Sequence, residues 1–229
     1  MSDTPSDLPP DMVVAVDGPS GSGKSSTSRG VAVRLGLRYL DTGAMFRAMT
    51  WWMLRAGVDV TDAAAVASRC EEPEILSGTH PEGPGIMVDG VDVGVAIRSD
   101  EVNAAVSHVS VVPAVRSRLL ELQRAAIGEG GIVVEGRDIG SVVWPQAQVK
   151  VFLTADPEAR ATRRAAETGS IDLTATRDSL LSRDRIDSGR ATAPLVMADD
   201  AVAVDTTGHT LDEVIDRVVA LAETAGERA

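Results

Sequence analysis

The chain has 229 residues, of which 44% are hydrophobic and 3% aromatic, and its formal net charge is −12. This length fits one α/β domain with insertions, and the negative charge argues against nonspecific binding to nucleic acid. The single cysteine, Cys70, excludes an intrachain disulfide and suits a reducing cytoplasm, and no apolar run approaches the roughly 20 residues that span a bilayer. We expect residues 1–11, which are polar, acidic and rich in proline, to be a disordered lead-in, and residues 12–229 to form the domain.

A phosphate-binding loop is the first motif along the chain. Residues 18–25 read Gly-Pro-Ser-Gly-Ser-Gly-Lys-Ser, after a predicted strand over 12–17 and before a predicted helix over about 24–35. Such a turn directs backbone N–H groups and a helix N-terminus at one point, which attracts phosphate. Lys24, in a solvent-facing loop, would reach the β- and γ-phosphates, and Ser25 would hold Mg²⁺. The strand and helix on either side disfavour the alternative of a glycine-rich turn with a solvated lysine.

The middle of the chain departs from a regular alternation of strands and helices. Residues 38–40 predict a second strand, and about 43–56 predict a helix. Residues 86–93 have Asp-Gly at their centre and predict a β-hairpin. Because a hairpin does not fit a βαβ pattern, we interpret residues 57–98 as an insertion.

The second half returns to alternating elements. Helices are predicted over 99–110, 113–128 and 211–222 and after Asp156-Pro157, and strands over 132–135, 149–153 and 201–205. The fold class is therefore α/β, a doubly wound parallel sheet of about five strands with helices on both faces. In such sheets ligands bind at the carboxyl ends of the strands.

Charged residues gather in two parts of the second half of the chain, after the strand over 132–135 and in residues 160–190. Glu135 ends a buried strand, where a carboxylate could hold Mg²⁺ through water, and Arg137 and Asp138 would then face the same crevice. Residues 160–190 carry seven Arg against five acidic residues, so this segment is a candidate phosphate clamp in an acidic chain. The alternative for the first group is an ordinary strand-to-helix turn with exposed charges, and for Arg183, Asp187 and Arg190 of the second it is a solvated helix face.

The three histidines, His80, His108 and His209, have no spacing typical of a metal site. A kinase that acts on a hydroxyl usually benefits from a base, whereas an acceptor that is already a phosphate needs only positioning, Mg²⁺ and positive charge.

With these motifs the chain resembles the bacterial cytidylate kinases, from about Met12 to its C-terminus. The resemblance rests on residues 18–25, on 40–47 (Leu-Asp-Thr-Gly-Ala-Met-Phe-Arg) and on 135–140 (Glu-Gly-Arg-Asp-Ile-Gly). It also rests on Arg160 with Arg163-Arg164, and on Arg183-Asp184 through 190–195 (Arg-Ala-Thr-Ala-Pro-Leu). Three positions depart from some members: Thr42 replaces Ser, Glu135 replaces Asp, and Ile186 replaces Arg.

The resemblance implies a nucleoside monophosphate kinase fold, in which residues 57–98 enlarge the monophosphate-binding part and residues 158–192 form a lid. It implies the transfer of a phosphoryl group from ATP, with Mg²⁺, to CMP or dCMP. The residues for ATP would be Gly18, Pro19, Ser20, Gly21, Ser22, Gly23, Lys24, Ser25 and Ser26. The acceptor residues would be Thr42, Arg47, Ser107, Arg116, Arg137, Asp138, Arg183, Asp187 and Arg190. Lys24, Arg137 and Asp138 would act on the transferring group with the lid residues Arg160, Arg163 and Arg164.

Two other functions stay open from the sequence. The nearer is a P-loop kinase with a different monophosphate or a hydroxyl acceptor. The more distant is a nucleotide-dependent regulatory switch, but neither lysine lies in the Asn-Lys-x-Asp motif that reads guanine. We expect a cytoplasmic monomer with small-molecule substrates and no nucleic-acid or membrane partner.

Overall fold

A computed structural model describes residues 8–190 and 192–227. The chain divides into two units, a core unit of Met1–Tyr39 with Glu129–Ala229, and an inserted unit of Leu40–Gly128. The expected lead-in falls largely on residues 1–7, which lie outside the described part, as does Ala191 of the expected lid. Leu8 is described and packs against the hydrophobic core cluster.

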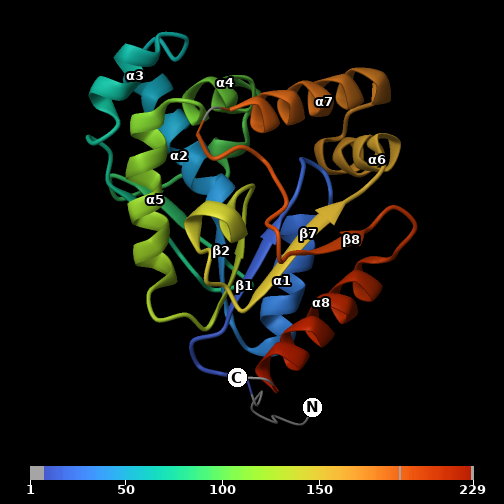
Figure 1. Ribbon diagram of the computed structural model, residues 1–229. Coiled ribbons are helices and arrows are strands. Elements are labelled where there is room, and N and C mark those ends of the chain that lie inside the picture. The colour runs from blue at the N-terminus through green and yellow to red at the C-terminus, as the bar shows by residue number, and fades with distance from the viewer. Residues whose placement is uncertain (1–7, 191, 228–229) are drawn as a thin grey trace. The chain divides into compact units, whose positions relative to one another are not determined.

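The core unit is built on a five-stranded sheet (Figure 1). Its strands are β1 (Val13–Asp17), β2 (Arg38–Asp41), β6 (Ile132–Glu135), β7 (Val149–Thr154) and β8 (Val202–Asp205), in the order β2-β6-β1-β7-β8. The central strand β1 runs parallel to both neighbours, with Val14 in register with Val133 of β6 and Val149 of β7. All five residues of β1 are buried, which explains its continuous apolar run. The predicted doubly wound parallel sheet is confirmed.

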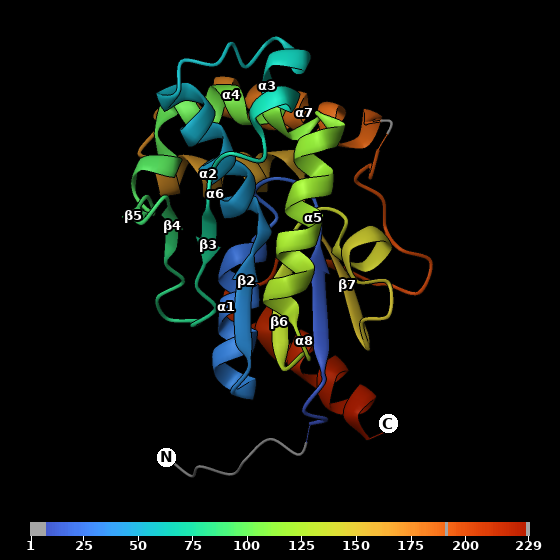
Figure 2. The same cartoon turned by 90° about the vertical axis from the view of Figure 1, so that its left-hand side faces the viewer.

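Helical segments cover both faces of this sheet. Helices α1 (Lys24–Leu35) and α8 (Leu211–Gly226) pack on one face, and the π-helical turn η2 (Ile139–Val143) lies on the other (Figure 2). Helix α8 buries Val214, Ile215, Val218 and Val219, whereas Leu211 at its first position is exposed. A capping box of Thr210 and Glu213 begins the helix. Helices α6 (Pro157–Thr168) and α7 (Leu173–Gly189) pack against each other, because Gly169 ends α6 with a φ of +70° and lets the chain turn.

The inserted unit combines helices with a small antiparallel sheet. Its helices are α2 (Thr42–Arg55), α3 (Ala63–Arg69), the short η1 (Ala96–Arg98), α4 (Asp100–Ser110) and α5 (Pro113–Ile127). Strands β4 (Ile86–Val88) and β5 (Val91–Asp92) form the predicted hairpin, and Asp89 and Gly90 both have positive φ, as a type I′ turn requires. The sequence analysis missed β3 (Ile75–Ser77), whose three residues are too few to show an alternating pattern; it pairs with β4.

No helix in the described ranges, 8–190 and 192–227, is long and apolar enough to cross a membrane.

Candidate active site

The P-loop follows β1 and is shaped by its glycines. Gly18 has a φ of +147°, and a Cβ there would lie 2.2 Å from the carbonyl oxygen of Leu153, so only glycine fits. Gly21 and Gly23 have φ values of +78° and +89°. Gly23 precedes α1, and no side chain caps that end of the helix. The loop and the first turn of α1 therefore offer backbone N–H groups to an anion.

Lys24 lies inside the loop and is not solvent-facing, which corrects the expectation from sequence. It is 7% exposed, and its ammonium donates a hydrogen bond to the carbonyl oxygen of Pro19 at 2.8 Å. Burial, and then the positive charge of Arg137, lower the pKa of Lys24 to about 7. A phosphate group beside this amine would favour its charged form.

Glu135 and Ser25 lie together, as expected for a metal site. The Ser25 hydroxyl donates to a carboxylate oxygen of Glu135 at 3.0 Å, and the buried Tyr39 hydroxyl donates to the other oxygen. Hydroxyl and carboxylate oxygens are ligands that Mg²⁺ accepts. Within the described residues no group of three or more His, Cys, Asp or Glu could hold a metal ion. One hydroxyl and one carboxylate could hold a magnesium ion whose other ligands are phosphate oxygens and water.

Asp17, the last residue of β1, is a candidate functional residue that the sequence analysis missed. Its two carboxylate oxygens accept hydrogen bonds from the backbone N–H groups of Ile139 and Gly140, each at 2.8 Å. These bonds tie the turn that carries Arg137 and Asp138 to the start of the P-loop. Burial raises the pKa of Asp17 to about 6, although the two backbone N–H groups oppose this shift. An acidic residue at the end of a buried strand was the signal that could have identified it.

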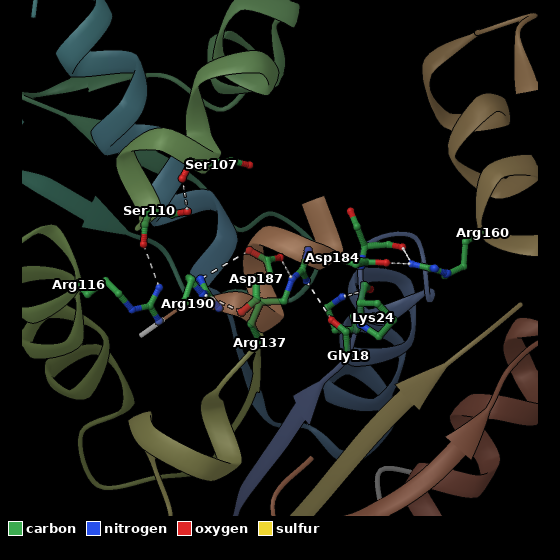
Figure 3. A network of polar contacts seen from close by, with 12 residues as sticks. Gly18, Lys24, Ser107, Ser110, Arg116, Arg137, Arg160, Asp184, Asp187 and Arg190 are labelled. Atoms are coloured by element: carbon green, nitrogen blue, oxygen red, sulfur yellow. Dashed lines mark hydrogen bonds and ion pairs between the residues drawn. The ribbon is translucent and has the colours of Figure 1, made fainter. Parts of the chain in front are cut away.

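Three of the predicted acceptor residues form one cluster at the end of α7. Asp187 lies between Arg137 and Arg190 in Figure 3. Its carboxylate accepts from Arg137 Nε at 2.9 Å and lies 3.6 Å from Arg190 Nη1. Arg137 also donates to the carbonyl oxygen of Gly18 at 3.1 Å. The structure thus joins the turn after β6, the C-terminal end of α7 and the P-loop.

The arginines of the expected lid have different partners. Arg160 donates to the carbonyl oxygen of Ser20 at 3.0 Å and to the carboxylate of Asp184. Both Arg163 Nη atoms donate to Thr206, whose hydroxyl in turn donates to the carbonyl oxygen of Ser22 at 3.1 Å. Arg164 pairs with Glu167 at 3.1 Å on the same helix. Arg160 and Arg163 therefore help to hold the P-loop in place, and Arg164 forms its ion pair with Glu167 within α6.

Arg183 of α7 lies in a crowded cationic environment. Burial, and then the charges of Arg137 and Arg164, lower the pKa of its guanidinium, and Asp187 and Asp184 oppose that effect. This arrangement of arginines is unfavourable without a bound anion.

The remaining predicted residues belong to the inserted unit. Thr42 is buried at the first position of α2, and Arg47 of the same helix donates to Asn103 at 2.7 Å and to the carbonyl oxygen of Ile97 at 3.2 Å. Arg116 of α5 donates to the carbonyl oxygen of Ser110 at 3.2 Å, and its guanidinium lies 5.2 Å from the centre of the Phe46 ring. The Ser107 carbonyl oxygen accepts from the Ser110 hydroxyl at 3.2 Å. Asn103, which positions Arg47, carried no signal in the sequence.

Comparisons with known proteins agree on one family. A family model described as "Cytidylate kinase" matches residues 14–224. The cytidylate kinase of Streptomyces avermitilis is 58% identical over 216 residues, which is 93% of this chain and 94% of the relative. That of Mycolicibacterium paratuberculosis is 51% identical over 213 residues, 91% of this chain and 93% of the relative. A crystal structure of an uncharacterized protein from Eubacterium ventriosum covers 93% of this chain and 99% of its own, with a TM-score of 0.54 at 9% identity, which supports the fold alone.

Proposed function

Because this chain belongs to the cytidylate kinase family, we propose that it transfers the γ-phosphoryl group of ATP to CMP or dCMP, giving ADP and CDP or dCDP. The observation that carries the proposal is the similarity to cytidylate kinases over more than nine-tenths of both chains. The buried P-loop lysine and the arginines around it support phosphoryl transfer, a reaction that depends on positioning and positive charge.

On the donor side, residues 18–26 bind the phosphates of ATP. The loop and the uncapped start of α1 supply N–H groups, and Lys24 supplies a cation that a phosphate would keep charged. Ser25 would hold Mg²⁺, with Glu135 in contact through water. When bound, the ion neutralises charge on the phosphate oxygens.

Around the transferring group, Arg137 and the lid residues Arg160, Arg163 and Arg164 supply positive charge, and Asp138 orients the reacting groups. No residue in this assignment acts as a general base, because the acceptor phosphate is already an anion. Closure of the lid, residues 158–192, would exclude water that otherwise hydrolyses ATP.

We assign the acceptor residues from the family to which the chain belongs. In the core unit these are Arg137, Asp138, Arg183, Asp187 and Arg190. In the inserted unit they are Thr42, Arg47, Ser107 and Arg116, and residues 57–98 enlarge the monophosphate-binding part. The supporting observation in the inserted unit is that Arg47 and Arg116 both donate hydrogen bonds, at 2.7 and 3.2 Å, which favour one orientation of each guanidinium group.

We further propose that the protein acts as a monomer in the cytoplasm, on small molecules alone. The net charge of −12 weighs against binding to nucleic acid, and a single buried cysteine fits a reducing compartment.

The test is ADP formation from ATP with CMP, dCMP, UMP and AMP, compared side by side, with a Lys24→Met variant as control for a contaminating kinase. We expect CMP or dCMP to give the highest kcat/KM. A higher kcat/KM with UMP, with AMP or with a hydroxyl acceptor would support another P-loop kinase instead. Binding of GTP in preference to ATP, without turnover, would support a regulatory switch.

A further inference from the structure

One carboxylate in the core unit joins the P-loop to both lid helices. Asp184 of α7 accepts a hydrogen bond from the backbone N–H of Ser20 through Oδ1, at 3.2 Å. Its other oxygen, Oδ2, accepts from Arg160 of α6, as Figure 3 shows. The same Nη1 of Arg160 donates to the carbonyl oxygen of Ser20 at 3.0 Å. Ser20, Arg160 and Asp184 therefore close a ring of polar contacts.

At this ring the loop and α6 lie close together. A Cβ on Gly21 would be 3.2 Å from both the Cβ and the carbonyl oxygen of Arg160. The Arg160 side chain is 6% exposed and that of Asp184 17%. Hydrogen bonds between charged groups are stronger when they are shielded from water. The ring can therefore set the position of the loop before a nucleotide arrives.

Asp184 also offsets positive charge near the loop. Its carboxylate acts to raise the pKa of Lys24, together with Glu135 and Asp17, against the larger effect of burial. It acts in the same direction on Arg183. Loss of this negative charge would leave neighbouring cations to repel one another.

We infer that Asp184 is a positioning residue for phosphoryl transfer, whose carboxylate holds Arg160 and the Ser20 end of the P-loop in the arrangement that receives the phosphates of ATP. The inference rests on the proposed function, in which Arg160 and the loop act on ATP. Asp184 itself touches neither the reacting atoms nor the proposed metal residues, so its effect passes through Arg160 and Ser20.

The test is the affinity of AMP–PNP with magnesium chloride, measured by titration calorimetry on the full chain. Asp184→Asn keeps the shape of the side chain but removes its charge, and we expect binding to weaken about tenfold or more. In steady-state assays, kcat/KM for ATP should fall by a similar factor, while KM for CMP stays within about twofold. Asp178→Asn, on the exposed part of the same helix, is the matched control and should behave as wild type.

A double-mutant cycle separates positioning from general stability. If Asp184 acts through Arg160, Asp184→Asn should weaken AMP–PNP binding by less than about twofold in an Arg160→Ala background. Equal weakening in both backgrounds would overturn the inference, as would wild-type affinity in the single variant.

If Asp184→Asn does not fold, Asp184→Glu and Asp184→Gln replace it, since they differ only in charge. The Glu variant should then bind AMP–PNP at least about fivefold more tightly than the Gln variant, and equal affinities of the two variants would overturn the inference.

The two proposals fail in different ways. A wild-type protein that binds AMP–PNP but does not phosphorylate CMP or dCMP would refute the proposed function, and the binding cycle would still decide the role of Asp184. A wild-type protein that binds no AMP–PNP would refute both.

Discussion

Replacing Lys24 by methionine should have opposite effects on catalysis and on stability. Methionine matches the length of the lysine stem, so it fills the buried position without a cavity but carries no charge. Lys24 is 7% exposed, and in the free protein its ammonium donates a hydrogen bond to the carbonyl oxygen of Pro19. The amine is therefore costly to bury without substrate and becomes useful once a phosphate is beside it.

The expected fall in kcat follows from the electrostatic role of the Lys24 ammonium. Removal of one donor aimed at transition-state charge costs about 3–4 kcal/mol, so kcat should fall about 100- to 1000-fold.

The effect on stability follows from the pKa. Burial lowers the pKa of Lys24 from 10.5 to about 7, so between these values the unfolded chain binds more protons than the folded one. The free energy of unfolding contributed by Lys24 therefore rises with pH across this window, and the cost of burial is fully present below pH 7. Lys24→Met should consequently be at least as stable as wild type at pH 7, with an advantage that shrinks toward pH 10.

The assay combines chromatographic measurement of ADP formation with thermal melts at several pH values. The matched control is Lys150→Met, which removes the other lysine of the chain. Lys150 contacts both carboxylate oxygens of Asp200, at 2.9 and 2.8 Å, so its loss should lower Tm and leave kcat within about twofold. The reasoning is refuted if Lys24→Met keeps more than about a tenth of the wild-type kcat, or melts below wild type at pH 7.

Three further predictions concern the phosphates and the lid. At pH 8, binding of AMP–PNP should be accompanied by uptake of up to about one proton, because a bound phosphate raises the lowered pKa of Lys24. Calorimetry in buffers of different ionisation enthalpy measures the proton uptake, and equal uptake by Lys24→Met would contradict the prediction. Arg190→Ala should raise KM for CMP about tenfold and KM for ATP less than about twofold, and parallel increases would place Arg190 outside the acceptor site. Hydrogen exchange in residues 158–192, above all at the Gly169 turn, should slow when ATP and CMP analogues bind together, with α8 as the internal control; slow exchange without ligand would exclude a lid.

The sequence alone determined the fold class and the phosphate-binding loop. Both depend on local chemistry. The strand is apolar and rich in β-branched residues, the loop has glycines where the backbone adopts positive φ, and a helix begins at Lys24. The Asp89-Gly90 turn was predictable for the same reason, since a type I′ turn favours those two residue types. The order and spacing of the charged motifs identified the family, which the similar proteins then confirmed.

Only the tertiary structure decided which charged groups touch and how deeply they are buried. The sequence predicts that Lys24 faces solvent, yet the packing around the loop buries its side chain and lowers its pKa. Asp17 and Asp184 lie far along the chain from their partners, 122 residues from Ile139 and 164 from Ser20, so the sequence does not show these contacts. Electrostatic strength depends on distance and on exclusion of water, and both arise only when distant segments pack together.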